Sequence, residues 1–146
     1  MNLKITKTKR SILKTIDPEL APTGSESTYI QVSRSVGAKL FDDSIQRDYT
    51  YNGQKFAYVN GFGPNVGQRF VIKIKGRKYY SYITEHAGPA TCDIDYTEKD
   101  KLLEVLEKHG WAIQDYKGHE GDRNLGLIKG KLVCVDFGPM SRNQFL

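Results

Sequence analysis

Residues that can bind a metal ion or move a proton are concentrated in the last quarter of the chain. The loop and the hairpin found there contain six such residues: Asp115, Lys117, His119, Asp122, Asn124 and Asp136. Two apolar runs, joined by a predicted two-residue turn at Lys129-Gly130, separate Asn124 from Asp136. A hairpin can hold an amide oxygen and a carboxylate at a fixed separation, and Mg²⁺ is a hard cation that prefers oxygen ligands. The pattern therefore indicates metal and phosphate chemistry.

Length and composition predict one soluble globular domain. Its 146 residues, 38% of them hydrophobic and 27% charged, are enough to bury a core, and no apolar run approaches the length of a transmembrane span. The N-terminal segment is basic but lacks the apolar run of a secretory signal, so we expect a cytoplasmic protein. The two cysteines, Cys92 and Cys134, are too few for a disulfide framework or a zinc site. Both are expected to be reduced, with Cys134 buried.

Hydrophobic periodicity predicts an α+β fold, in which a small antiparallel sheet with one helix precedes a second helix and a hairpin. The predicted parts of this single domain, 1–146, are an N-terminal arm and loop at 1–27, a sheet lobe at 28–84, a connector at 85–96 and a C-terminal part at 97–146. The sheet lobe is expected to contain strands at 29–33, 36–41, 70–74 and 78–84, with a helix from Asp43 to about Asn60 that Gly53 weakens. A further helix, capped by Thr97, is expected to end at Lys108-His109-Gly110.

The element order and the motifs together resemble the protein-kinase-like fold in a reduced form, over residues 28–138. Val36-Gly37-Ala38-Lys39 looks like the family's strand lysine motif, which implies that Lys39 binds ATP phosphates. Gln54 stands near the position of the helix glutamate that pairs with this lysine in the family. The segment from Glu85 to Ala87 resembles the hinge, whose backbone contacts adenine.

The resemblance also implies Mg²⁺ as a cofactor together with ATP. Asn124 lies twelve residues before Asp136-Phe137-Gly138, which is close to the family's spacing of its two metal ligands. The family expects an aspartate five residues before that asparagine, where this chain has His119. Two alternatives stay open: Asp115 is the base and Lys117 the phosphate-side lysine, or Asp122 or His119 approaches the acceptor hydroxyl from within the loop.

Three functions are compatible with these features. The first is a minimal kinase-like protein that binds Mg-ATP and transfers phosphate to a hydroxyl; its compactness resembles that of small kinase-like chains encoded by bacteriophages. Only eight residues follow Gly138, so the lobe that would hold a peptide is missing, which favours the second, an inactive pseudokinase that regulates a host protein. The net charge of +5 favours anionic partners and gives the third, a small nucleic-acid binder in which Tyr79, Tyr80 and Tyr82 offer stacking surfaces.

Overall fold

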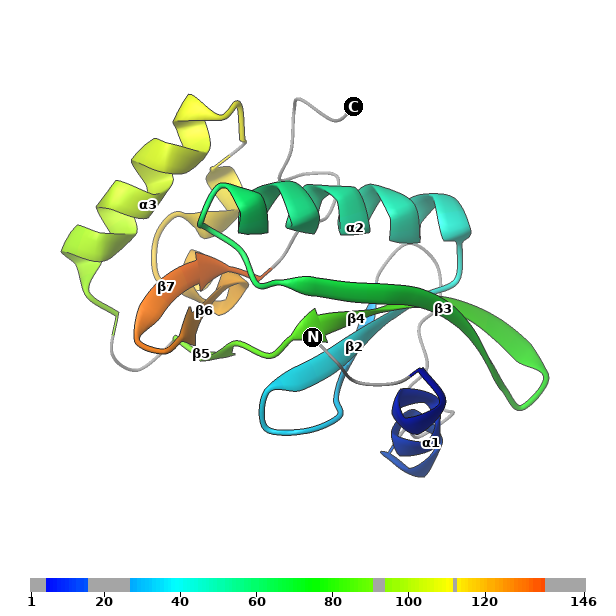
Figure 1. The fold of residues 1–146 in the computed structure, drawn as a ribbon. Helices are drawn as coiled ribbons and strands as arrows, with labels where there is room; N and C mark the ends of the chain where they lie inside the picture. Colours follow the sequence, from blue (N-terminus) through cyan, green and yellow to red (C-terminus); the bar gives the residue numbers. More distant parts are fainter. Residues whose placement is uncertain (1–4, 16–26, 91–93, 112, 136–146) are drawn as a thin grey trace. The chain divides into compact units, whose positions relative to one another are not determined.

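The computed structural model describes residues 5–15, 27–90, 94–111 and 113–135, and within them the protein has an α+β fold with antiparallel sheets (Figure 1). The chain divides into two compact units, one formed by 1–51 and 65–86 and the other by 52–64 and 87–146. In chain order the helices and strands are α1 (Ile5–Thr15), β1 (Thr28–Gln31), β2 (Val36–Phe41), α2 (Ser44–Val59), β3 (Val66–Ile74), β4 (Arg77–Glu85), β5 (Gly88–Pro89), α3 (Tyr96–Lys108), β6 (Leu125–Ile128) and β7 (Lys131–Cys134). Two short 3-10 helices, η2 (Gln114–Tyr116) and η3 (Glu120–Asn124), lie between α3 and β6. The helices in the described ranges are all too short or too polar to cross a membrane.

The first unit is built on a four-stranded antiparallel sheet with the strand order β1-β2-β4-β3. All six residues of β2 are buried, as expected for a strand with neighbours on both sides and cover on both faces. Its register places Lys39 opposite Tyr29 of β1 and Tyr82 of β4. The predicted strands are confirmed, although β3 begins at Val66, four residues before the expected start.

The N-terminal arm was predicted incorrectly, because residues 5–15 form the helix α1. Thr8 and Ile12 lie four residues apart on one side of this helix, and both are fully buried. Ile12 belongs to the same core as Ile72 and Ile74 of β3. A single buried turn is too short to give a clear apolar stripe in the sequence, and packing on the sheet supplies the stability that such a short helix lacks alone.

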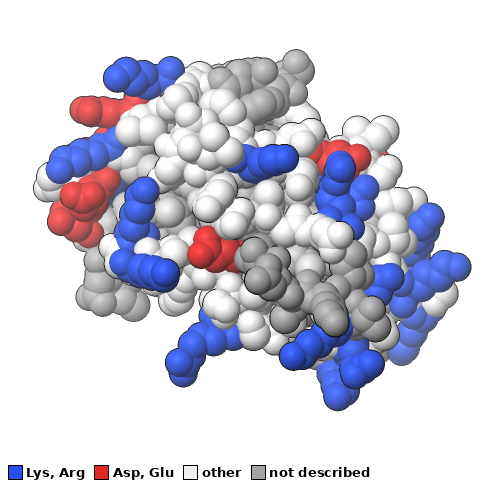
Figure 2. All heavy atoms as spheres, in the orientation of Figure 1, with Lys and Arg blue, Asp and Glu red and all other residues white. Residues whose placement is uncertain are grey.

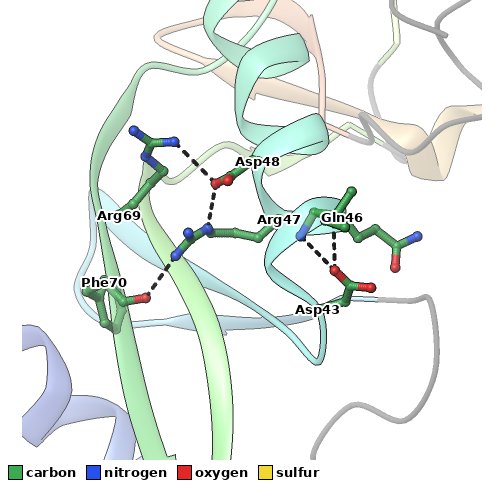
Figure 3. Close-up of polar contacts among 7 residues, drawn as sticks. Asp43, Gln46, Arg47, Asp48, Arg69 and Phe70 are labelled. Carbon is green, nitrogen blue, oxygen red and sulfur yellow. Dashed lines mark hydrogen bonds and ion pairs between the residues drawn. The ribbon is translucent and has the colours of Figure 1, made fainter.

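The first turns of α2 are tied to β3 by a group of polar contacts (Figure 3). Asp43 accepts a hydrogen bond from the backbone amide of Ile45 at 2.6 Å and so caps the helix. Asp48 forms ion pairs with Arg47 at 2.8 Å and with Arg69 of β3 at 3.2 Å. These contacts hold the start of the helix on the sheet. The helix therefore covers the face of β4 that carries Tyr82, and Tyr51 packs edge-on to that ring. The helix continues unbroken through Gly53.

The second unit combines α3 with a three-stranded antiparallel sheet in the order β5-β6-β7. Its core is aromatic: Phe62 packs edge-on to Trp111, and Phe56 stacks on the same indole at 5.8 Å between ring centroids. The turn between β6 and β7 is the predicted one, since Lys129 and Gly130 both have positive φ, 50° and 79°. Two consecutive residues of this kind form the tight turn that matches the twist of a hairpin.

The start of α3 corrects another expectation, because Asp95 and not Thr97 caps this helix. The Asp95 carboxylate accepts hydrogen bonds from the backbone amides of Thr97 at 2.9 Å and Glu98 at 3.4 Å. We expect Asp95→Ala to lower the free energy of unfolding by about 1 kcal/mol, because these amides then lose their protein acceptor. Thr97→Ala is the matched control, and urea denaturation of both variants gives the comparison. Equal losses in the two variants would contradict the capping role of Asp95.

Candidate functional site

Lys39, the predicted phosphate-binding residue, lies on the central strand β2 of the first unit and is only 9% exposed. Its ammonium group is 5.9 Å from the centre of the Tyr82 ring, within the range of a cation–π interaction. Lysine is rarely buried to this extent, because its charge loses hydration. A lysine held this way on a rigid strand is well suited to bind phosphate oxygens as a point charge.

Beside Lys39 the face of the sheet is covered by the ring of Tyr29. The ring lies on Gly37, where a Cβ atom would collide with the end of the phenol, so a larger residue there would displace the Tyr29 ring. The Tyr29 hydroxyl is 2.5 Å from Nδ1 of His86, and the two rings stack. Burial raises the pKa of Tyr29 to about 12, so the hydroxyl stays protonated at neutral pH. Tyr29, the cross-strand partner of Lys39, and His86 therefore form a stacked and hydrogen-bonded pair beside this lysine.

The predicted hinge begins at the end of β4, where most backbone amides are already paired within the first unit. The Glu85 amide donates to Asn65 at 2.9 Å, and the His86 amide donates to Ser35 at 2.9 Å. The Glu85 carboxylate accepts from the Asn65 amide at 3.1 Å. The Glu85 carbonyl is engaged as well, since it accepts from the Thr84 hydroxyl at 3.0 Å, and Ala87 belongs to the second unit.

A buried ion pair organises the predicted catalytic loop of the second unit. Lys99 of α3 and Asp122 of η3 lie 2.5 Å apart, and each is 4% exposed. The Lys99 ammonium also donates to the carbonyl of Gly118 at 2.8 Å. The Tyr96 hydroxyl is 2.8 Å from Nδ1 of the exposed His119 and 3.4 Å from Asp122. Two of the predicted catalytic residues, His119 and Asp122, are therefore brought together, around a lysine and a tyrosine that the sequence analysis had not identified.

The sequence contains a signal for Lys99 that the helix prediction did not use. Lys99 comes three residues before Leu102 and seven before Leu106, so all three share the buried side of α3. A lysine on an apolar stripe requires an anionic partner, and Asp122 is the carboxylate that supplies it. Burial raises the pKa of Tyr96, and the charge and hydrogen bond of Asp122 raise it further, so the phenol stays protonated beside the pair.

The rest of this loop is shaped by close backbone packing. The Gly121 amide donates to the Lys117 carbonyl at 3.2 Å, and any Cβ atom at Gly121 would collide with the backbone of Tyr116. Lys117 itself is exposed. Asp115 lies in η2, next to the fully buried Tyr116, and its side chain is outside the described part of the structure.

Asn124, one of the two predicted metal ligands, lies at the open end of the β6–β7 hairpin. The Asn124 carbonyl accepts a hydrogen bond from the Val135 amide at 2.9 Å, which extends the ladder one step beyond the pair Leu125 and Cys134. Asp136 follows Val135 directly but lies outside the described residues. Among the residues that are described, no three His, Cys, Asp or Glu side chains form a metal-binding group.

Gln54, the predicted helix partner of Lys39, is fully buried, and its side-chain amide donates to the Pro64 carbonyl at 3.1 Å. This bond lies within the second unit, whereas Lys39 belongs to the first. The predicted burial of Cys134 is confirmed.

Comparison with known proteins gives no relative from which a role could be transferred. No protein-family model matches the chain, and no curated protein or solved structure is significantly similar to it. The function is therefore argued from the local geometry around Lys39 in one unit and around Asn124 and the Lys99–Asp122 pair in the other.

Proposed function

We propose that this chain is a reduced kinase-like protein that binds ATP together with Mg²⁺. One observation carries the proposal: the register of the β6–β7 hairpin pairs Asn124 with Val135 through a 2.9 Å hydrogen bond, immediately before Asp136. Asn124 is therefore held at the end of the hairpin, and the chain continues from its partner Val135 directly into Asp136, the second predicted ligand. One amide and one carboxylate oxygen, with phosphate oxygens and water completing the shell, fit the way Mg²⁺ is bound with nucleotides.

The first unit supports the nucleotide part of the proposal. Its order of elements is a strand that carries Lys39, the helix α2, and then the β3–β4 hairpin, whose second strand pairs with the lysine strand and ends at Glu85. This is the order that the kinase-like resemblance implies for the sheet, the lysine and the hinge. Lys39 would bind phosphate oxygens, and backbone groups from Glu85 to Ala87 would contact the base.

Transfer of the terminal phosphate to a hydroxyl would use the loop between α3 and β6. The acceptor oxygen forms a bond to the γ-phosphorus, the bond to the β-phosphate oxygen breaks, ADP leaves, and a base takes the hydroxyl proton. Asp122 is held by Lys99 and is 4% exposed, which favours a role in positioning the loop. Asp115 therefore remains the favoured base, with the exposed His119 as its alternative and Lys117 on the phosphate side.

Calorimetric titration with ATP tests the proposal. We expect binding in the presence of Mg²⁺ that weakens at least tenfold when the metal is removed, because the metal joins the phosphates to Asn124 and Asp136. Asp136→Asn should reproduce the loss in the presence of Mg²⁺, while Asp100→Asn, an exposed change of equal charge on α3, should have no effect. Equal affinity with and without Mg²⁺, or no binding at all, would overturn the proposal.

A second candidate is an inactive relative of this kind that binds nucleotide and acts as a regulator of a host protein. The observation that favours it is the engagement of two candidate bases: Asp122 by Lys99, and Nδ1 of His119 by Tyr96. Its signature would be Mg-ATP binding without release or transfer of a labelled γ-phosphate over hours.

A further inference from the structure

The net positive charge of the protein comes from the first unit. Residues 1–51 and 65–86 contain 13 Lys and Arg against 7 Asp and Glu, a net charge of +6, whereas the rest of the chain has 9 against 10, a net charge of −1. Figure 2 shows Lys and Arg side chains gathered over α1 and the end of the β3–β4 hairpin. This asymmetry favours anionic partners for the first unit.

The end of the β3–β4 hairpin places like charges directly opposite one another. Lys73 of β3 is the cross-strand partner of Lys78 of β4, and Lys75 occupies the turn between them with a φ of 50°. Like charges at such a pair destabilise a sheet. Within the described ranges, no carboxylate lies at ion-pair distance from Lys73, Lys75 or Lys78, while the neighbouring Arg77 is paired with Asp42. An arrangement that costs stability and has no carboxylate partner in the described part of the chain suits an external anion.

Helix α1 adds a second row of cations to this region. Lys7, Arg10 and Lys14 are exposed and follow one another at intervals of three and four residues, so they line one side of the helix. The opposite side carries Thr8 and Ile12, which are buried, and α1 contacts β3. We call these two groups together the basic surface: Lys7, Arg10, Lys14, Lys73, Lys75 and Lys78.

We infer that the basic surface binds the phosphate backbone of duplex nucleic acid. Stacking of unpaired bases is disfavoured, which corrects the expectation that the tyrosines of β4 offer stacking surfaces. Tyr79 is 2% and Tyr82 0% exposed, and the half-buried Tyr80 ring has Arg47 and Lys78 within 6 Å of its centre. Because these rings are buried or have cations over them, the surface offers mainly charges, and these suit phosphates that keep their bases paired.

Other anionic partners fit these residues less well. Protein interfaces are depleted in lysine and depend on aromatic or apolar anchors in their centre, and the basic surface consists of five lysines and one arginine. A helix that lies on a membrane inserts its apolar side, whereas Ile12 of α1 is already buried in the core of the first unit. A phosphate backbone requires neither feature.

Fluorescence anisotropy with a labelled 20-base-pair DNA duplex of arbitrary sequence tests this inference. Each neutralised phosphate contributes about −0.9 to the slope of log K against log salt concentration, so the six cations can make this slope no steeper than about −5. We expect Lys73→Gln/Lys78→Gln to weaken binding about tenfold at low salt and to make the slope shallower by about 2, since two phosphate contacts are lost. The melting temperature of this variant should equal or exceed that of the wild type, because the like-charge pair is removed.

The matched control is Lys55→Gln, a loss of one positive charge on the exposed part of α2 in the second unit. This variant should keep the wild-type affinity and salt slope. The inference is overturned if the double variant binds the duplex as tightly as the wild type does. It is equally overturned if the control loses as much affinity for each charge removed as the double variant does. It is also overturned if a single strand of equal charge, or poly-glutamate of equal length, binds more tightly than the duplex.

Discussion

Asp122→Asn is expected to lower the free energy of unfolding by about 3 kcal/mol, a large part of the stability of a small protein. Asp122 and Lys99 are each 4% exposed and form a 2.5 Å ion pair, so the substitution leaves a buried ammonium group without its counter-charge. The remaining hydrogen bond from Lys99 to the Gly118 carbonyl does not neutralise that charge. Urea denaturation measures the loss as a lower midpoint at an unchanged slope.

The double variant Lys99→Met/Asp122→Leu provides the control, because it removes both charges and fills the buried site with apolar side chains. It should recover most of the lost stability, as is common when a buried pair is replaced by hydrophobic residues. It also separates the two roles of Asp122. A double variant that folds normally and still transfers phosphate would show that Asp122 positions the loop and is not the base. A single variant as stable as the wild type would contradict the importance of the pair.

The parts of the fold that were predictable are those whose signals are local. Lys129-Gly130 and the alternation of apolar residues around it define the β6–β7 hairpin, since turn chemistry and strand period act over a few residues. The strand that carries Lys39 was predictable for the same reason. Helix α1 was missed because two buried residues, Thr8 and Ile12, give too little periodicity, and its stability depends on a sheet formed later in the chain.

The candidate site was predictable only where its spacing is carried by one hairpin. Asn124 and Val135 are brought together by β6 and β7, so their separation in the sequence is informative. The pair of Lys99 and Asp122 joins a helix to a loop 23 residues later, and no local pattern encodes that contact. The position of Lys99 on the apolar stripe shows that a partner must exist, but many carboxylates in the chain could have served. Composition likewise gave the net charge, while its concentration in one unit depends on the fold.

Lys39→Met is expected to weaken Mg-ATP binding about a hundredfold, equivalent to about 2.7 kcal/mol. The reason is electrostatic: Lys39 is 9% exposed on a rigid strand, so its charge acts on phosphate with little screening by water. Methionine has a similar length and an apolar side chain, so it should fill the buried position beside Tyr82. Lys73→Met, at an exposed position of the same sheet, should leave the affinity unchanged.

The environment of Lys39 also gives this variant a readout that a purely structural lysine would not change. The Tyr29 ring rests on Gly37 and its hydroxyl is hydrogen-bonded to Nδ1 of His86, so we expect a nucleotide that enters beside Lys39 to displace that ring or to stack on it. Either event changes the environment of the His86 imidazole. We expect Mg-ATP to shift the His86 ring signals in nuclear magnetic resonance spectra of the wild type and of Lys73→Met, and to leave them unshifted in Lys39→Met at the same concentration. Undiminished shifts in Lys39→Met would mean that the nucleotide binds without this lysine, and the phosphate-binding role of Lys39 would then be wrong.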